Sequence, residues 1–597
     1  MRTAAMQLLE GKEFKGFSIE LSEMKQTVRT ERRKQPIEID ESVPLETRIA
    51  NQVTPLWSTP YPDQLTMKTE AALTQMSLFK KDLLKFMPRR FVPSQDPLSF
   101  TSINEIKEMK SEDRPAYQLD WIFRRAAEIC PIAPCIPSPV IDGYRNKCEF
   151  TFGVTPSGER TLGFLLGLFK DGITTVLPPT NCIHVSDSAK SIARCLEVYA
   201  HSSQYDVYNR ELKTGVWRSC LVRTYTTNSN MVIIQLNPSS INADIIREME
   251  LEIVANICAL NVGVSSIYIQ NWAGDFNGIN SDTGECRLVY GESYVEEVLG
   301  GFTFRVSPFA FFQVNTKAAE VLYGHVGDLC RKSLEELKAE VLVTSKNTVE
   351  ANQDHVSTEA VKDVCTFEVI EDKTLGEREQ QQEKDESVST VIDLKPSAEP
   401  DFIFPNMSTE PGIILLDLCC GTGTIGITLA KDVKHVIGVE MIPEAIRDAE
   451  ANAKSNGIQN ITFFASKVED VIYRIFKSIP PTDKVIAILD PPRAGMHPKV
   501  ILKLRSCARL QRNFFCFILD IIFVSCDLKL SRANYLGLCR PLSNKFKGHS
   551  FRPVSCSVID MFPHTPNCEV VCQFTRDYEP QDEDDMDAKI GEVLNEE

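Results

Sequence analysis

Strands and helices alternate along the chain from residue 411 onward, and this alternation restricts the fold more than any other sequence feature. Apolar runs of strand length occur at 413–416, 435–440, 461–464 and 485–490, with helical segments through Ala430 and over 443–456. Chains with this pattern build βαβ units, whose strands run parallel in one sheet with helices on both faces. We therefore expect an α/β fold with a doubly wound, mostly parallel sheet.

The length of 597 residues is too great for one ordinary domain and predicts two or three. The formal net charge of −17 is concentrated in two segments, residues 335–401 with a net charge of −11 and residues 575–597 with −8. The rest of the chain is close to neutral, so the acidic composition does not exclude a nucleic-acid partner.

The N-terminal part of the chain is expected to hold small elements and a linker. In residues 1–25, a helical run at 4–11 precedes a strand-like run at 15–21, and the pair resembles the second half of an RNA-recognition motif. The strands that carry base-stacking aromatic side chains belong to the other half, so we expect no RNA binding from this segment. Residues 26–115 are expected to be a linker with one or two helices, because prolines precede the helical periodicity at 69–86.

Short strand-like runs separated by Gly, Asn and Asp dominate residues 116–300, which predicts a separate α+β region. Residues 301–575 are expected to form the α/β domain, interrupted by an acidic insertion at 335–410. Such a segment buries too little apolar surface to offset the entropy of ordering, so we expect disorder there, although a helix could continue over 335–343. Residues 576–597 are expected to be an acidic tail.

The 19 cysteines predict neither disulfides nor a metal site. They are scattered, no Cys-x-x-Cys pair occurs, and no histidine pairs complete a zinc site. Reduced thiols of this kind fit a protein of the cytoplasm, the nucleus or both. We identify no signal peptide, and the apolar run at 514–524 is interrupted by Asp520 and is too short to cross a bilayer. We expect a monomer with no membrane partner.

Gly421, Gly423 and Gly426 form a G-x-G-x-x-G loop between the first strand and its helix, and Glu440 ends the second strand. The glycines allow the backbone to approach a ligand, and the carboxylate can accept hydrogen bonds from ribose hydroxyls. NAD and S-adenosylmethionine both suit this geometry, and a purely structural turn is a third interpretation.

The tetrad Asp490-Pro491-Pro492-Arg493 at the end of the fourth strand favours one of these cofactors. The carboxyl ends of the strands face the ligand in such a sheet, and the prolines stiffen the backbone that presents Asp490. Methyltransferases that act on planar nitrogen or carbon acceptors need such an element, whereas dehydrogenases do not. The tetrad therefore favours S-adenosylmethionine, with a plain turn as the alternative.

Cys526 and Glu569, near the end of the chain, are a candidate nucleophile and proton acceptor. Uracil C5 is a weak nucleophile until a thiolate adds to C6 and turns the ring into an enolate, which can attack an electrophilic methyl group. The methylated C5 must then lose its proton to a base before the thiolate leaves, and such help is typically worth about 10²–10⁴-fold. Taken singly, the two side chains would be an inert buried thiol and a surface carboxylate.

The chain resembles the tRNA (uracil-5-)-methyltransferase family, in its eukaryotic branch with an N-terminal RNA-recognition motif, over residues 120–335 and 411–575. The resemblance rests on these motifs, on Tyr144-Arg145-Asn146-Lys147 and on the segment Ser-Pro-Phe-Ala-Phe-Phe-Gln-Val-Asn at 307–315. It implies a class I, Rossmann-like methyltransferase domain after an α+β RNA-binding region, with S-adenosylmethionine as cofactor. It also implies 5-methyluridine in the T-loop of the tRNA T-arm as product, and no iron–sulfur cluster.

The resemblance implies roles for single residues. The family's nucleophile falls on Cys526 and its base on Glu569. The cofactor positions fall on Gln313, Cys419, Gly421, Gly423, Thr424, Glu440 and Asp490. Arg145, Lys147 and Lys170 are candidate contacts to tRNA phosphates, with a solvated surface as the alternative.

Two features near the thiol depart from the family pattern. Asp527-Leu528 replace the usual Asn-Pro after Cys526, and the run at 515–522 looks several residues too long. An Asp beside a thiolate raises the pKa of the thiol, and the extra residues could distort the strand that presents it. Two alternatives therefore stay open: a tRNA-binding or tRNA-folding protein with an impaired site, and an NAD-dependent oxidoreductase that leaves Cys526 and Glu569 idle.

Overall fold

The computed structural model describes most of the chain. The described residues are 13–14, 17–18, 42–86, 122, 128–167, 174–275, 278–353, 404, 412–480, 483–506, 517–541, 543, 545–546 and 550–576. Near the N-terminus, β1 (Glu13–Phe14) pairs with β2 (Phe17–Ser18) in antiparallel fashion. β2 falls within the strand expected at 15–21 but is shorter, and the helical run at 4–11 lies outside the described residues. The partial RNA-recognition motif therefore stays a prediction.

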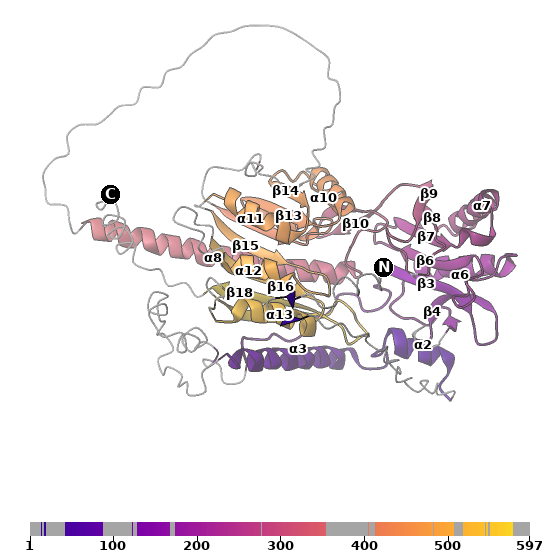
Figure 1. The fold of residues 1–597 in the computed structure, drawn as a ribbon, viewed down its shortest axis with the longest axis horizontal. Coiled ribbons are helices and arrows are strands. Elements are labelled where there is room, and N and C mark those ends of the chain that lie inside the picture. The colour runs from indigo at the N-terminus through magenta and orange to yellow at the C-terminus, as the bar shows by residue number, and fades with distance from the viewer. Residues whose placement is uncertain are drawn as a thin grey trace, which may run out of the picture.

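The C-terminal half folds around a seven-stranded sheet with the order β14-β13-β12-β15-β16-β18-β17 (Figure 1). Its strands are β12 (Ile413–Leu418), β13 (His435–Glu440), β14 (Ile461–Ala465), β15 (Lys484–Leu489), β16 (Phe517–Ser525), β17 (Phe551–Ile559) and β18 (Glu569–Arg576). The five strands from β14 to β16 run parallel, whereas β18 is antiparallel to both of its neighbours. The expected doubly wound, mostly parallel sheet is confirmed.

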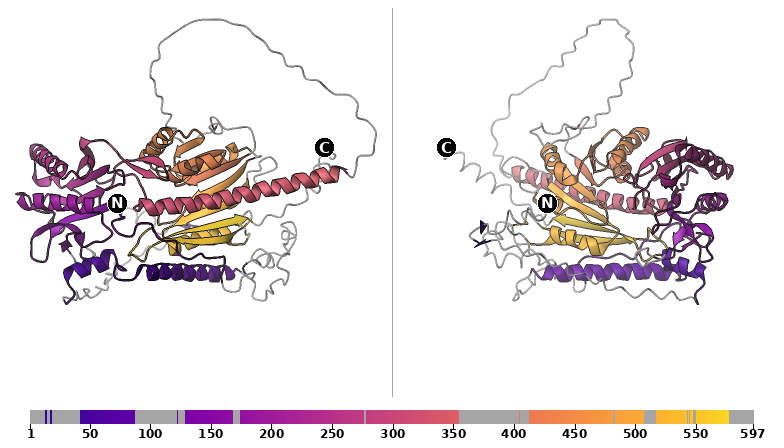
Figure 2. Two further views of the ribbon diagram at one scale, coloured as in Figure 1. Left: turned by 180° about the vertical axis from the view of Figure 1, so that it is seen from behind. Right: turned by 45° about the vertical axis from the view of Figure 1, so that its right-hand side comes forward.

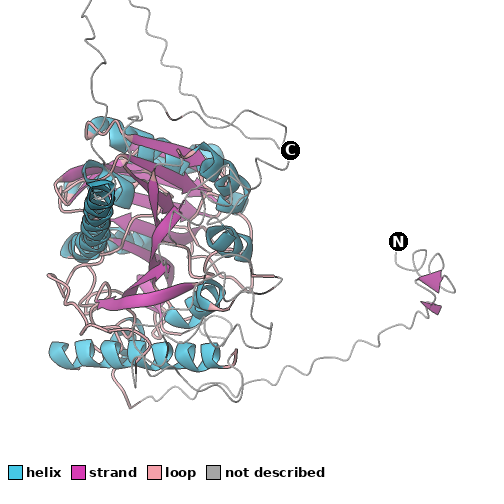
Figure 3. Cartoon of the chain, turned by 90° about the vertical axis from the view of Figure 1, so that its left-hand side faces the viewer, coloured by secondary structure: helices cyan, strands magenta, loops and turns pink. Residues whose placement is uncertain are grey.

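Helices cover both faces of this sheet, so that the strands lie between helical layers (Figure 3). One face packs against α11 (Val468–Ser478), α12 (Pro498–Ser506) and α13 (Leu528–Cys539). The other packs against α8 (Thr316–Gln353), α9 (Thr424–Leu429) and α10 (Pro443–Ser455), with the short η4 (Ala430–Asp432) after α9. Successive strand residues point to opposite faces, so each buried strand contributes to two separate cores.

A second seven-stranded sheet occupies residues 147–291, in the order β5-β4-β3-β6-β7-β8-β9. Its strands are β3 (Lys147–Val154), β4 (Arg160–Leu165), β5 (Val176–Leu177), β6 (Trp217–Arg223), β7 (Asn230–Leu236), β8 (Val264–Asn271) and β9 (Glu285–Gly291). All neighbours are antiparallel except β7 and β8. One face packs on α6 (Asp187–Ser202) and α7 (Ala243–Ala259), and the short η3 is Pro238–Ser240. This is the expected α+β region.

The hairpin of β10 (Val295–Leu299) and β11 (Phe302–Val306) crosses the boundary expected at residue 300. The backbone N–H groups of Thr303 and Arg305 donate hydrogen bonds to the side chains of Asn456, which caps the end of α10, and Asn452, within α10. The hairpin therefore packs with the C-terminal domain, and the expected boundary lies too late in the chain.

The expected linker at 26–115 contains a helix that is part of the C-terminal core, so its description as a linker is wrong. α2 (Leu45–Val53) is short, whereas α3 (Tyr61–Leu84) runs along α13 and the edge strand β17 (Figure 1). The buried residues of α3 are Gln64, Lys68, Ala72, Met76, Phe79 and Leu83. This spacing places them on one helical face, and the last four join the same apolar core as α13. The helical periodicity predicted α3, but it did not predict what α3 packs against.

The first part of the segment expected to be an acidic insertion is helical. α8 continues to Gln353, through the first part of the segment expected to be disordered, and the rest of that segment apart from Phe404 lies outside the described residues. Figure 2 shows α8 and α3 as two long helices on opposite sides of the C-terminal sheet. None of the helices in the described part of the chain combines the length and the apolar character needed to cross a bilayer.

A β-bulge near the start of β16 accommodates one extra residue before Cys526. Val485 of β15 pairs with Ile518, but the next residue, Ile486, pairs with Asp520, so one residue of β16 is left over. From Asp520 to Ser525, β16 pairs with β18 without a further shift. The expected distortion of the strand is therefore confined to its start and does not reach Cys526.

Candidate active site

The glycine loop turns sharply between β12 and α9. Cys419, Gly421 and Gly423 have φ angles of 70°, 55° and 79°, in the left-handed region that favours glycine. A Cβ added at Gly421 would meet nothing within 4 Å, whereas at Gly426 it would lie 3.0 Å from Val436. The first position therefore leaves room for a ligand beside the backbone, and Gly426 lets α9 pack closely on the sheet.

Asp417, in β12, fixes the glycine loop through a hydrogen bond to the backbone of Gly426. Its side chain is fully buried, and its Oδ2 accepts a hydrogen bond from the Gly426 N–H at 2.9 Å. Its Oδ1 has no hydrogen-bond partner among the described residues. Burial, with a smaller contribution from the charge of Glu440, raises the pKa of this carboxyl group to about 7. The loop therefore rests on an acid that is about half protonated near pH 7.

Glu440 lies at the end of β13, against the loop. One carboxylate oxygen accepts the Gly421 N–H at 3.2 Å, and the other accepts the N–H groups of Met441 at 2.7 Å and Ile442 at 3.1 Å. Both apolar side chains that follow it are exposed. The structure thus brings the acidic strand end and the glycine loop together, as their order in the sequence predicted.

Asp490 ends the neighbouring strand β15, where its N–H donates to the carbonyl of Leu418 at 3.3 Å. Burial of the carboxyl group raises its pKa to about 7, with a contribution from Asp417. The charges of Asp490 and Asp417 raise the pKa of the Tyr323 hydroxyl in α8, in addition to the effect of burial. Tyr323 therefore lies near both acids. Its Oη also accepts a hydrogen bond from Thr424 Oγ1 at 3.2 Å, so the predicted loop residue Thr424 faces Tyr323.

Cys526 and Glu569 lie opposite each other across β16 and β18. Ser525 pairs with Val570 in antiparallel register, so the residue after Ser525 faces the residue before Val570. Glu569 is 4% exposed, and Cys526 is half-buried. The two predicted catalytic residues, 43 positions apart in sequence, therefore meet through strand pairing.

Burial and neighbouring carboxylates disfavour the charged forms of this pair. Burial raises the pKa of the Cys526 thiol, and the charges of Glu569 and Asp490 raise it further. Burial also raises the pKa of Glu569 well above its usual value, with Asp490 acting in the same direction. Glu569 Oε2 has no hydrogen-bond partner within the described ranges. A buried carboxyl group with a pKa perturbed in this way is a candidate for exchanging a proton with a substrate.

Arg493 opposes these shifts and was missed as a site residue by the sequence reasoning. Its charge lowers the pKa of Glu569, and its charge and a hydrogen bond lower that of Cys526. The signal was present, since Arg493 closes the tetrad that begins with Asp490. Tyr323 was missed as well, and no motif around it could have identified it.

Asp527 is not among the groups that shift the pKa of the Cys526 thiol most. Its carboxylate caps α13 and accepts the N–H groups of Lys529 at 2.9 Å and Leu530 at 3.2 Å. The carboxylates that raise the pKa of Cys526 are instead Glu569 and Asp490. The departure from Asn-Pro therefore serves the helix start.

The segment around Gln313 joins the two regions of the molecule. Asn146 Nδ2 donates to the carbonyl of Gln313 at 2.8 Å, and the Asn146 N–H donates to that of Val314 at 2.8 Å. Asn315 Nδ2 reaches the carbonyl of Met561 at 3.3 Å, in the loop that precedes Glu569. Gln313 is buried at this junction, and a cofactor contact through its side chain stays a prediction.

The candidate phosphate contacts are less exposed than expected. Burial and the charge of Arg223 lower the pKa of Lys147 to about 8. The guanidinium Nε of Arg145 donates to the carbonyl of Lys147 at 3.0 Å. Lys170 lies outside the described residues. Lys147 is therefore a weaker candidate for phosphate binding than its place in the sequence suggested.

Comparison with known proteins identifies the family. A family model described as "Methyltransferase domain" matches residues 409–507. The chain is 31% identical to tRNA (uracil-5-)-methyltransferase homolog A of Homo sapiens, over 96% of this chain and 75% of that protein. It is 28% identical to homolog B of Homo sapiens, over 89% and 84%. The solved structure of Pyrococcus abyssi tRNA (uracil-54, C5)-methyltransferase with S-adenosyl-L-homocysteine matches with a TM-score of 0.46 and 18% identity, over 79% of this chain and 85% of that chain. With its similarity to homolog A extending over nearly its whole length, the chain belongs to the tRNA (uracil-5-)-methyltransferase family, as its motifs predicted.

Proposed function

We propose that this protein methylates C5 of uridine in the T-loop of tRNA, with S-adenosylmethionine as the methyl donor, Cys526 as the nucleophile and Glu569 as the proton acceptor. The observation that carries the proposal is the strand register that sets Cys526 opposite Glu569. It brings a thiol and a buried, unpartnered carboxyl group to the sheet edge at which Asp490 and the glycine loop also end. The names of the relatives in other organisms support the same substrate.

The residues at this edge fit S-adenosylmethionine. The open space beside Gly421 suits a ligand that lies against the loop, and Glu440 is positioned for ribose hydroxyls. Asp417 and Asp490 are acids whose charged forms are disfavoured in the protein alone, and the positive sulfonium of the cofactor would favour those forms. When bound, the cofactor supplies an electrophilic methyl group. Gln313, Cys419, Gly423 and Thr424 complete the proposed cofactor site.

The chain's own residues then act on the uracil ring. Cys526 Sγ forms a bond to C6, and the electrons of the C5=C6 bond move toward O4 to give an enolate, whose C5 becomes the nucleophile for the methyl group. Glu569 removes the proton from the methylated C5. The electrons of that C–H bond restore C5=C6 and release Cys526 as a thiolate.

Arg493 is suited to assist both residues. A guanidinium stays charged over the whole working pH range and stabilises a nearby thiolate or carboxylate. It lowers the pKa of both Cys526 and Glu569, against the effect of burial. We infer that Arg493 keeps the thiolate accessible when the uracil ring enters between Cys526 and the cofactor. The α+β region at 147–291 would hold the folded RNA, from which a flipped uridine reaches the site.

The proposal is tested with a T-arm RNA that carries 5-fluorouridine. Fluorine at C5 cannot leave as a proton, so a working enzyme with S-adenosylmethionine stalls as a covalent complex that shifts on a denaturing gel. We expect the shifted band with the wild type and with Cys195→Ala, a half-buried thiol of α6, but not with Cys526→Ala. Methyl transfer that persists in Cys526→Ala would refute the assignment of the nucleophile.

Glu569→Gln separates the two halves of the reaction. The amide keeps the shape of the carboxyl group but cannot take the C5 proton. We expect C6 addition to proceed, product release to slow by about 10²-fold or more, and a covalent complex with ordinary uridine RNA to accumulate. Normal turnover without such a complex would show that another group is the base.

The assay with 5-fluorouridine RNA and a thermal-stability measurement distinguish the two alternatives. RNA binding without a covalent complex in the wild type would identify a tRNA-binding protein with an impaired site. Thermal stabilisation by NAD, and none by S-adenosylhomocysteine, would identify an oxidoreductase. The cytoplasmic or nuclear location and the monomeric state stay predictions.

A further inference from the structure

Residues 560–568, here called the base loop, connect β17 to β18 and end at the proposed base. Ile559 and Glu569 are the last pair of the β17–β18 ladder, so the base loop closes this hairpin. Glu569 is therefore attached to the rest of the molecule by one strand and by the conformation of this loop. Any contact that fixes the base loop also fixes the start of β18.

Four successive carbonyl groups of the base loop each accept a hydrogen bond from a residue outside it. The donors are Asn315 Nδ2 to Met561 at 3.3 Å, Lys68 Nζ to Phe562 at 3.1 Å, Tyr144 Oη to Pro563 at 3.1 Å and the Leu56 N–H to His564 at 2.9 Å. Two of these donors come from segments that carry family motifs. The other two come from the segment that was expected to be a linker.

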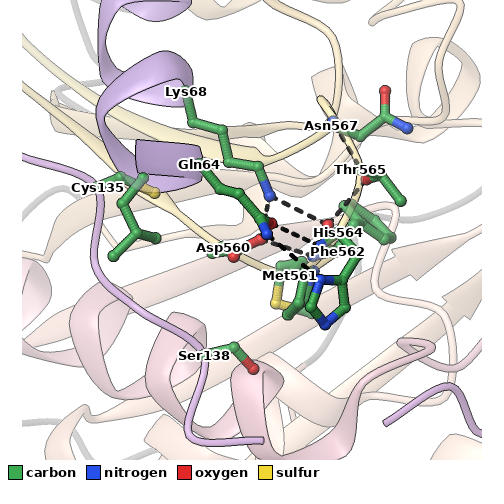
Figure 4. Close-up of polar contacts among 12 residues, drawn as sticks. Gln64, Lys68, Cys135, Ser138, Asp560, Met561, Phe562, His564, Thr565 and Asn567 are labelled. Atoms are coloured by element: carbon green, nitrogen blue, oxygen red, sulfur yellow. Dashed lines mark hydrogen bonds and ion pairs between the residues drawn. The ribbon is translucent and has the colours of Figure 1, made fainter. Parts of the chain in front are cut away.

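Lys68 of α3 also forms an ion pair with Asp560, the first residue of the base loop (Figure 4). Its ammonium group lies 2.5 Å from Asp560 Oδ1, and the side chains are 1% and 0% exposed. Asp560 Oδ1 also accepts the N–H of Phe562 at 3.1 Å. Asp560 Oδ2 is buried without a hydrogen-bond partner among the described residues, so the buried carboxylate depends on its pairing with Lys68. The ion pair therefore fixes the position of the first loop residue relative to α3.

Gln64, one helical turn before Lys68, holds the middle of the loop. Its Oε1 accepts the His564 N–H at 2.8 Å, and its Nε2 donates to the carbonyls of Leu56 at 3.1 Å and Thr59 at 2.8 Å. His564 has a φ of 65°, a conformation that residues other than glycine adopt only when surrounding contacts hold them. These contacts supply that restraint, together with Asp142 at 2.9 Å from the imidazole Nε2.

We propose that Lys68 and Gln64 are positioning residues for the proposed base, and that α3 thereby completes the active site from outside the two seven-stranded sheets. The inference rests on the proposed function, because it assigns these residues to the proton-removal step. Their contacts lead to Glu569 through the base loop, whereas Cys526 follows a different strand, β16, and is not attached to this loop. Loosening the loop should therefore slow proton removal more than C6 addition.

The test uses the full-length chain with Lys68→Met and, as a matched control, Lys81→Met on the exposed face of the same helix. For Lys68→Met we expect the rate of covalent complex formation with 5-fluorouridine RNA to stay within about threefold of the wild type, because Cys526 keeps its place. A misplacement of about 1 Å affects only the step that uses the displaced group, which is Glu569. Turnover on ordinary uridine RNA should fall about tenfold or more, with KM unchanged and a covalent complex accumulating as in Glu569→Gln. Lys81→Met should behave as the wild type in both assays.

Equal turnover of Lys68→Met and Lys81→Met, or an equal loss of complex formation and turnover in Lys68→Met, would overturn the inference. If Lys68→Met is not folded at the assay temperature, Gln64→Leu, which leaves the ion pair in place, decides by the same two rates. A wild type that forms no complex with 5-fluorouridine RNA would instead refute the proposed function itself.

Discussion

Replacing Asp417 by Asn tests whether the sheet holds a neutral acid beneath the glycine loop. Asp417 is fully buried, its Oδ2 accepts the Gly426 N–H at 2.9 Å, and its pKa is raised to about 7 from a usual value of 3.8. Asn has the same shape, and its amide oxygen can accept the same hydrogen bond. The substitution therefore removes the titration and changes little else.

The magnitude follows from the difference in pKa. The folded protein keeps the proton up to about pH 7, whereas the unfolded chain releases it above about pH 4, so the carboxyl group's contribution to stability is fully present below about pH 4 and is lost as the pH rises through 7. A difference of about three pKa units corresponds to roughly 4 kcal/mol. We expect Asp417→Asn to unfold with a free energy up to about 4 kcal/mol higher than the wild type at pH 8, and with almost no difference near pH 4.

The measurement is urea unfolding of the full-length chain, followed by circular dichroism at several pH values between about 4.5 and 8. Asp282→Asn makes the same chemical change on an exposed loop and should alter the free energy of unfolding by less than about 0.5 kcal/mol at every pH. A difference between Asp417→Asn and the wild type that does not change with pH would refute the neutral, buried acid.

Three further predictions concern the core and the cofactor site. Phe79→Ala should lower the free energy of unfolding by about 3–5 kcal/mol in a denaturant titration. Phe79 of α3 is 1% exposed, and its ring packs edge-on against that of Tyr535 of α13 with the ring centroids 5.7 Å apart. A change below about 1 kcal/mol would show that α3 is dispensable. Gly421→Ala should weaken S-adenosylhomocysteine binding about tenfold or more in calorimetry. The added methyl group strains a backbone with a φ of 55° and fills the open space beside the loop. Unchanged affinity would place the cofactor elsewhere. The affinity for S-adenosylmethionine relative to that for neutral S-adenosylhomocysteine should rise between about pH 6 and 8, because the sulfonium favours the charged form of Asp490; a constant ratio would contradict this.

The features that sequence reasoning identified are those encoded by neighbouring residues. The glycine loop, the acidic ends of β13 and β15 and the alternation of strands with helices all depend on local backbone preference and on short-range order along the chain. Parallel βαβ units allow few arrangements, so this local pattern also predicted the sheet and the edge at which the loop, Glu440 and Asp490 meet. Cys526 and Glu569 could be chosen as a pair because they carry motifs whose chemistry needs both.

Other parts of the site depend on contacts between residues far apart in the chain, and no local pattern encodes them. The helical periodicity of α3 predicted a helix, but its partner, α13, lies more than 440 positions away. Asp527 was expected to act on the adjacent thiol, but its carboxylate turns to the start of α13, because unpaired helical N–H groups there offer it hydrogen bonds. Adjacency in sequence therefore did not identify the carboxylates that shift the pKa of Cys526 most, which are Glu569 and Asp490.

By itself, the sequence determined which chemical groups are present and which fold class brings strand ends together, because both follow from residue type and local periodicity. Only the tertiary structure decided the register that sets Cys526 opposite Glu569, the raised pKa of Asp417 and the burial of Lys68 against Asp560. The physical reason is that strand register, desolvation and ion pairing depend on distances across the folded molecule, which exist only after the chain has packed.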